Sequence, residues 1–375
     1  MRYRLFLYLW CALAAPAAVS AQSESDASAA RPPVLFDLGV RLLGADVYLG
    51  YRGLTVPPNP DTILWVALGG GYEWLNYFRD SANHLYTGGG GYSLDDVTYD
   101  RINGRFDLGI AQGMVWNERL KFNLLEAFLF YKMRVDYVVD NPSKNELILD
   151  SGLPDAAGLL QNSFLIGMSY NDLDKNDPHW KLSGVYAELS AEWAPEFFFN
   201  NSWGRADFIR LNLTAKGFLP LFDIDPSAEF NLLSAYLGGF FSVDWCGGTS
   251  IPINVQQSFG GLRGRQGLGY AVRGYEDARF DGLFKAVVNA EFRLNLPQFK
   301  IIDVFTPGIY VFFDSGYYNY IYYDEQGFLF SSGAGIYLNA WKLTTFTLYV
   351  VAPFNHPLID GTTWVHIGIG LDAHF

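Results

Sequence analysis

The fold of this chain is decided by the stretch FGGLRGRQGLGYAVRGYEDARFDGLFKAVVNAEFRLNL, residues 259–296. Its first part, 259–282, is rich in glycine and charge and is far too long for a hairpin turn. From Phe284 to Leu296 the side chains alternate: Lys285 and Glu291 share a polar face, and Val288 lies on the apolar one. Because successive side chains of a strand point to opposite faces, this segment predicts a strand with one polar face and one apolar face.

The same alternation recurs along most of the chain. In 205–217, for example, Ile209 and Leu211 oppose Arg210 and Asn212. Many segments exceed the ~5–6 residues usual for soluble strands and match the ~9–11 residues that cross a bilayer. The predicted strands are 34–43, 45–53, 61–78, 97–114, 119–137, 159–173, 179–194, 205–219, 228–244, 283–296, 300–318, 328–340, 343–353 and 362–375.

The connections between these strands also differ by end. The connections at one end of the predicted strands are short, and those at the other end are mostly longer. The turn around Gly44, which belongs to the longer set, is the exception. A membrane barrel has this asymmetry, with apolar residues outside and polar ones inside, and it leaves no open sheet edge in hydrocarbon. A soluble β-sandwich or propeller would not need it. We therefore predict an all-β fold, a transmembrane antiparallel β-barrel over 34–375 with a lid loop at about 245–282.

The N-terminus predicts export. Residues 1–21 combine two arginines, an apolar run and the small-residue end Val19-Ser20-Ala21, which is typical of a secretory signal peptide. Residues 22–33 are rich in Ser and Ala and predict a short disordered lead-in. Of the two cysteines, Cys11 lies in the leader, so Cys246 is left without an internal disulfide partner.

Composition and motifs argue against several functions. A formal net charge of −13 makes the chain a poor binder of nucleic acid. No nucleophile elbow, Walker loop or Rossmann fingerprint is found, and the five histidines lack metal-ligand spacing. We therefore expect no enzyme activity, no catalytic residues, and no metal or cofactor.

The lid loop and the strands after it resemble the BamA/TamA superfamily, also called bacterial surface antigen barrels. The resemblance covers about the last 120 residues and is carried by a motif in the loop, a motif two strands later, and a terminal aromatic residue. These are Val272-Arg273-Gly274-Tyr275, Phe312-Phe313-Asp314-Ser315-Gly316 and Phe375. The resemblance implies sixteen strands, whereas the sequence shows fourteen; two more would have to lie within 79–96 or 138–158, or the barrel is smaller.

The resemblance also implies an ionic contact that holds the lid loop inside the barrel. In the family the loop folds back into the lumen and its arginine meets acids on the inner wall, which here places Arg273 against Asp314, with Glu291 close by. Alternation agrees, because Glu291 lies on the polar face of its strand, and Phe312, Asp314 and Gly316 share one face of theirs. The alternative is that Arg273 is a solvated loop cation. Phe375 would serve as the C-terminal assembly signal.

The function implied by the resemblance is assembly and insertion of outer-membrane proteins, or protein translocation, in the bacterial outer membrane. A weak seam between 34–43 and 362–375 would open sideways, helped by Gly368 and Gly370. Family assembly factors carry periplasmic POTRA domains, for which 22–33 leaves no room, so we expect a periplasmic partner in their place. Other expected partners are outer-membrane lipid and the assembly machinery that inserts the barrel itself. The alternative is a passive, porin-like pore or structural surface protein.

Overall fold

The chain folds into one large antiparallel sheet in this computed structural model. The structure describes residues 34–41, 43–56, 59–80, 82, 84–86, 96–118, 122–139, 148, 151–174, 182–224, 233–296, 305–321, 325–340, 344–356 and 365–371. The strands of the sheet are β1 (Val34–Arg41), β2 (Gly44–Val56), β3 (Asn59–Asn76), β4 (Thr98–Asn117), β5 (Phe122–Val139), β6 (Gly158–Asn171), β7 (Gly184–Ala194), β8 (Asp207–Ile224), β9 (Leu233–Ser250), β12 (Phe284–Asn295), β13 (Phe305–Tyr320), β14 (Glu325–Ala340), β15 (Thr344–Pro353) and β16 (His366–Leu371).

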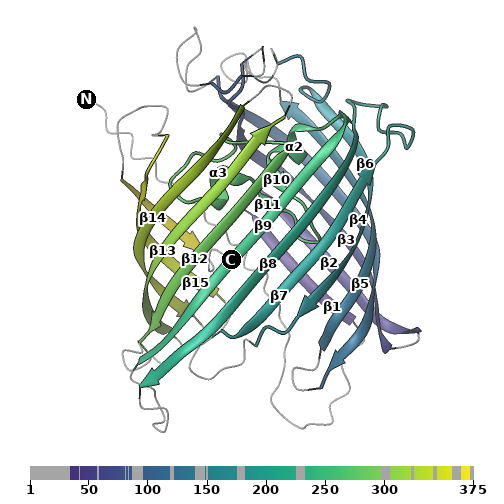
Figure 1. Cartoon of the computed structure of the whole chain (residues 1–375). Coiled ribbons are helices and arrows are strands. Elements are labelled where there is room, and N and C mark those ends of the chain that lie inside the picture. The colour runs from purple at the N-terminus through teal and green to yellow at the C-terminus, as the bar shows by residue number, and fades with distance from the viewer. Residues whose placement is uncertain are drawn as a thin grey trace.

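These fourteen strands lie side by side in chain order, each antiparallel to the next. They tilt around a common axis, so that the sheet curls into a cylinder (Figure 1). The fourteen described strands correspond one for one to those predicted from the sequence, which confirms the all-β barrel fold. The two further strands implied by the family resemblance are not found in the described parts of 79–96 and 138–158, which hold an isolated bridge and turns.

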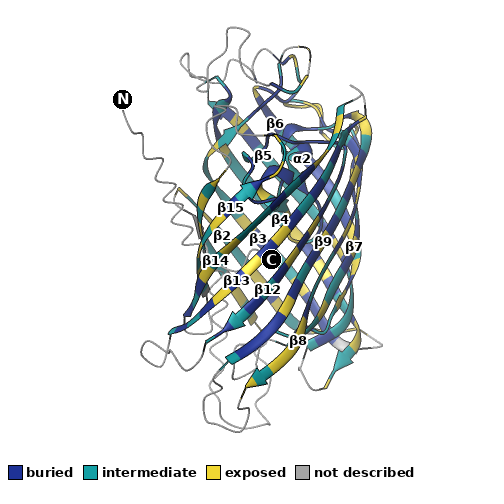
Figure 2. Cartoon of the chain, turned by 60° about the vertical axis from the view of Figure 1, so that its left-hand side comes forward, coloured by how far each residue is buried: buried dark blue, intermediate teal, exposed yellow. Residues whose placement is uncertain are grey.

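Burial alternates along the strands as the sequence predicts (Figure 2). On β12, Lys285, Asn289 and Glu291 are buried inside the cylinder, whereas Val288 is exposed on its outer face. Leu189 of β7 and Ile209 and Leu211 of β8 are likewise exposed. An outer surface of exposed aliphatic side chains is suited to contact with lipid acyl chains, as expected for a transmembrane barrel.

The lid loop connects β9 to β12 and lies inside the cylinder (Figure 1). It contains α2 (Ile253–Gln256), the hairpin strands β10 (Ser258–Phe259) and β11 (Arg265–Gln266), and α3 (Leu268–Ala271). Because β9 continues to Ser250, the lid spans 251–283 and begins later than the predicted 245. Phe259, Leu268 and Phe280 of the lid pack with side chains of the wall strands in the largest buried apolar cluster of the described residues.

Three sequence predictions lie outside the described residues: the signal peptide 1–21, the lead-in 22–33 and the terminal Phe375. Among the helices that the structure describes, none has the length and apolar character needed to cross a membrane.

Candidate functional site

Arg273 of the lid binds two acids on the inner wall. Its Nε and Nη2 donate to the two oxygens of Asp314 at 2.7 and 2.8 Å, and its Nη1 donates to Glu291 Oε1 at 2.6 Å. Its backbone N–H also donates to Asp314, at 3.1 Å. The planar guanidinium fork suits this bidentate geometry. The structure thus brings Arg273, Asp314 and Glu291 together, in the arrangement implied by the family resemblance.

An aromatic ring completes this contact. The guanidinium carbon of Arg273 lies 3.5 Å from the centroid of the Phe312 ring, which is close enough for a cation–π interaction. The side chains of Arg273 and Asp314 are 3% and 0% exposed. Burial alone would lower the pKa of Arg273, but its hydrogen bond to Asp314 and the two carboxylates outweigh burial and raise that pKa. We call Arg273, Glu291, Asp314 and Phe312 the Arg273 anchor.

Arg293 belongs to the same cluster, although the sequence motif did not single it out. Its Nε donates to Glu291 Oε2 at 2.6 Å, so Glu291 bridges two arginines with its two oxygens. Two cations and two anions therefore balance one another in a buried space. Arg293 follows Glu291 by two residues and shares its interior face, and this spacing was the signal that could have identified it.

The remaining motif residues shape the lid around the anchor. Val272 is fully buried in the apolar cluster, and Gly274 has a φ of +94°, which favours glycine. A Cβ on Gly316 would lie 2.8 Å from Val272 Cγ2, so this glycine lets the lid approach the wall. The Tyr275 hydroxyl donates to Asn355 Oδ1 at 2.6 Å and accepts the Phe330 N–H at 3.1 Å, which attaches the lid to β14.

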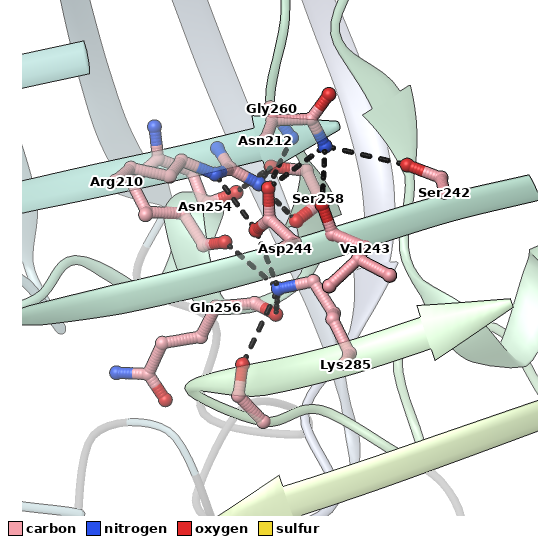
Figure 3. A network of polar contacts seen from close by, with 12 residues as sticks. Arg210, Asn212, Ser242, Val243, Asp244, Asn254, Gln256, Ser258, Gly260 and Lys285 are labelled. Carbon is pink, nitrogen blue, oxygen red and sulfur yellow. Dashed lines mark hydrogen bonds and ion pairs between the residues drawn. The ribbon is translucent and has the colours of Figure 1, made fainter. Parts of the chain in front are cut away.

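A second anchor holds the first half of the lid (Figure 3). Its centre is Asp244 of β9, whose carboxylate accepts from Arg210 Nε at 2.8 Å and lies 3.4 Å from Lys285 Nζ. These wall residues then bind the lid backbone. Asp244 accepts the Gly260 N–H at 3.0 Å, Lys285 donates to the Gln256 carbonyl at 2.9 Å, and Arg210 donates to the Ser258 carbonyl. We call Asp244, Arg210 and Lys285 the Asp244 anchor.

Only part of the Asp244 anchor can be predicted from the amino-acid sequence. Alternation places Arg210 and Lys285 on polar faces, but the segment that holds Asp244 has a blurred pattern, with apolar residues on both faces. In the sheet Lys285 is the register partner of Asp244, and Asp244 is the partner of Asn212. The lid contributes mainly backbone groups here, with the Ser258 hydroxyl 3.3 Å from Arg210 Nη2 as a side-chain contact, so no charged lid motif could reveal this anchor.

Two buried acids lie at the edges of the lid. Asp155 Oδ2 accepts the Ile253 N–H at 2.6 Å, which holds α2 against the segment before β6. Asp281 lies at the other end of the lid, just before β12. Burial is the main cause that raises the pKa of each carboxyl, to about 7 for Asp155 and about 7 for Asp281.

A cavity of about 180 Å³ lies between the lid and the last strands. Arg273 and Tyr275 line it from the lid, Thr347 and Tyr349 from β15, and Gly370 from β16. In the described part of the chain, no three His, Cys, Asp or Glu side chains are grouped so that they could hold a metal ion.

Comparison with protein-family models and with curated proteins gives no match. Among solved structures, BamA from Haemophilus ducreyi lacking POTRA domains 1–3 is similar with a TM-score of 0.51 and 11% identity, over 90% of this chain and 63% of that chain. CdiB from Escherichia coli gives a TM-score of 0.49 and 13% identity, over 91% of this chain and 62% of that chain. The chain thus spans less than two thirds of the length of each. At this identity the likeness to BamA concerns the fold, and this chain shares the barrel fold of BamA.

Proposed function

We propose that this chain is a bacterial outer-membrane barrel that works with a partner protein in the assembly and insertion of other outer-membrane proteins, or in protein translocation. The barrel fold that it shares with BamA supports the membrane location. The observation that carries the proposal is a direct packing route from the lid to the last described strand.

That route runs through two aromatic rings. The Phe312 ring, which holds the Arg273 guanidinium, packs edge-on against the Tyr349 ring, with centroids 5.7 Å apart. Tyr349 of β15 is the register partner of Gly368 in β16. A Cβ on Gly368 would lie 2.1 Å from Tyr349 Cζ, so the tyrosine ring occupies the space that this glycine leaves free. A movement of the lid would therefore disturb the packing of β16.

This arrangement suits a barrel that opens beside its last strand. Glycine weakens a strand because it has no side chain to pack, and β16 has Gly368 and Gly370 within its six described residues. In the proposed mechanism, a client or partner shifts the lid, Tyr349 leaves Gly368, and the pairing of β16 loosens. A client strand or a lipid could then pass at that edge. The periplasmic partner would deliver the client.

The alternative function is a passive pore or a structural surface protein. It is favoured by how firmly the lid is bonded, because the Arg273 and Asp244 anchors hold both of its halves. A plug of this kind needs no moving part. The two functions differ in what happens to other proteins when this chain is lost.

Depletion of the protein, followed by quantification of all other outer-membrane proteins, tests the proposal. An assembly role predicts that several of them fall in amount, whereas a translocation role predicts that an exported protein stays in the periplasm. Complementation with Gly368→Ala, which pushes Tyr349 aside, should restore less function than wild type. The matched control is Gly104→Ala, because a Cβ there would meet nothing within 4 Å. Unchanged levels and unchanged export on depletion would favour the passive alternative.

A further inference from the structure

The connection between β7 and β8, residues 195–206, exposes two phenylalanine side chains. Phe197 is 77% exposed and Phe199 is 66% exposed, and Phe197 is the most exposed large hydrophobic side chain among the described residues. Between them, Phe198 turns toward the protein. A loop in water would gain nothing from holding two phenyl rings outward, since each ring is costly to hydrate. The pattern therefore raises the question of what these rings contact.

Phe198 shows which side of the wall the loop covers. Its ring lies 5.2 Å from the Phe164 ring and 6.0 Å from the Tyr131 ring, measured between centroids. Phe164 shares the outward face of β6 with the exposed Ile166, and Tyr131 shares the outward face of β5 with the exposed Leu129. The loop is therefore folded down over the outer face of β5 and β6, on the side that faces lipid.

The loop also satisfies its own polar groups at this position. Asn200, which is 0% exposed, donates to the carbonyls of Asn162 and Pro195 at 2.9 and 2.8 Å, and its Oδ1 accepts the Asn162 N–H at 2.6 Å. Leu160 N–H donates to the Trp203 carbonyl at 2.7 Å. The β6–β7 ladder covers β6 only from Phe164 onward, so the loop replaces β7 beside the first residues of β6. Backbone at membrane depth must be bonded within the protein in this way.

The loop is held rigidly in this conformation. Phe199 has a φ of 61°, which is uncommon for a bulky side chain and persists only where the surroundings impose it. The Asn200 N–H donates to the Glu196 carbonyl, and Ser202 N–H donates to the Phe199 carbonyl. The two exposed rings are thus presented by a fixed support.

The neighbouring surface identifies the occupant as lipid. The Trp193 ring of β7 meets the Phe197 ring edge-on, with the ring centroids 5.9 Å apart. Trp193 shares the outward face of β7 with the exposed Leu189. Trp203 packs against the exposed Tyr137 at 6.1 Å. Trp and Tyr gather where a barrel meets the membrane interface. Glu196 and Arg205, the charged pair of the loop, neutralise each other at 3.0 Å.

From these contacts we propose that the β7–β8 loop is a membrane-inserted wedge. It places Phe197 and Phe199 among the acyl chains, next to the membrane–water interface at the end of the barrel that has the longer connections. β7 and β8 are the seventh and eighth of the fourteen strands, so the wedge lies half-way round the sheet from β1 and β16. It would fix the wall in the lipid at the place farthest, along the sheet, from the two edge strands.

Site-directed spin labelling tests the proposal. Single cysteines are introduced by Phe197→Cys and Phe199→Cys, labelled with a nitroxide, and reconstituted into phosphatidylcholine vesicles. Leu189→Cys provides the lipid reference, and Asn201→Cys, in the same loop, provides the water reference. Cys246→Ala removes the native thiol, and the native chain can be used if that variant fails to fold, because Cys246 is buried. Heat-modifiability on gels verifies that each variant is folded.

The proposal expects the ratio of oxygen to nickel-chelate collisions at Phe197 and Phe199 to match Leu189 and to exceed that at Asn201. A ratio equal to that of Asn201 would place the rings in water and overturn the proposal. Spin–spin broadening that grows with the protein-to-lipid ratio would show instead that a second copy covers the loop, which would also overturn it.

Discussion

The two anchors of the lid hold opposite halves of the same loop by opposite means. At the Arg273 anchor the lid supplies a side chain and the wall supplies the acids. At the Asp244 anchor the wall supplies both the acid and the cations, and the lid supplies backbone N–H and carbonyl groups. The first anchor therefore depends on the Arg273 side chain, whereas the second depends on lid backbone groups and on Gly260, where a Cβ would lie 2.9 Å from Arg210 Nε. The two anchors therefore place different demands on the lid, a cationic side chain at Arg273 and the absence of a side chain at Gly260.

The largest effect is expected from Arg273→Ala. This change leaves Asp314 and Glu291 buried with fewer cations, and breaking a buried pair from one side costs about 3–5 kcal/mol. We expect the second half of the lid to open and to be cleaved much faster by proteinase K in the reconstituted barrel. Arg263→Ala is the matched control, because Arg263 is an exposed arginine of the same loop. Equal cleavage of the two variants would remove the basis for the Arg273 anchor.

A smaller effect is expected from Asp244→Asn. The amide keeps one acceptor oxygen for the Gly260 N–H but loses the charge that Arg210 and Lys285 face, and a hydrogen bond to a charged group contributes about 1.5–3 kcal/mol. Faster cleavage should appear near Ser258 and leave the segment around Arg273 protected. The control is Asp207→Asn, whose carboxylate accepts from Thr249. Cleavage around Arg273 in Asp244→Asn would mean that the anchors do not act separately.

Arg273→Lys should have a milder effect than Arg273→Ala. Lysine keeps the positive charge but cannot bind Asp314 with a planar fork while it also reaches Glu291. We expect a cleavage rate between those of the wild type and Arg273→Ala. If lysine were as damaging as alanine, the fork geometry would outweigh charge. If it matched the wild type, charge alone would account for the anchor.

The smallest effect is a pH dependence of lid stability, which we assign to buried Asp281 and not to the arginines of the anchors, because arginine does not titrate near neutrality. Burial raises the pKa of Asp281 to about 7, although Arg79 and Lys285 oppose the rise and Asp277 adds to it. An unfolded Asp titrates near ~3.9, so the folded lid binds more protons between these values. Lid stability is therefore greatest below about pH 4 and falls as the pH rises through about 7.

This pH effect is measured as the rate of lid proteolysis between pH 5 and pH 8, with the protease activity calibrated at each pH. The rate should rise with pH in the wild type and rise less in Asp281→Asn, whose side chain stays neutral. Asp155→Asn should reduce the remaining slope, because burial also raises the pKa of Asp155 to about 7. A slope that persists in the double variant would assign the effect to other groups.

Much of the fold follows from the sequence, because alternation states which side of each strand meets lipid. The Arg273 anchor was accessible for a related reason: its lid side chain belongs to a motif, and its acids lie at positions whose face is set by parity. The Asp244 anchor was accessible only in part: Arg210 and Lys285 lie on predicted polar faces, but the lid backbone groups that they bind carry no sequence pattern. The start of the lid was placed too early, because the Gly247-Gly248 pair resembles a loop although β9 continues through it to Ser250.

The central claim is that two separate anchors hold the lid inside the barrel. Hydrogen exchange of the lid amides, followed by mass spectrometry on the barrel in vesicles, tests it most directly. We predict slow exchange across 251–283 in the wild type, fast exchange confined to the segment around α3 and Arg273 in Arg273→Ala, and fast exchange confined to the segment around Ser258 and Gly260 in Asp244→Asn. Fast exchange across the whole lid in either single variant, or no change in both, would contradict the claim.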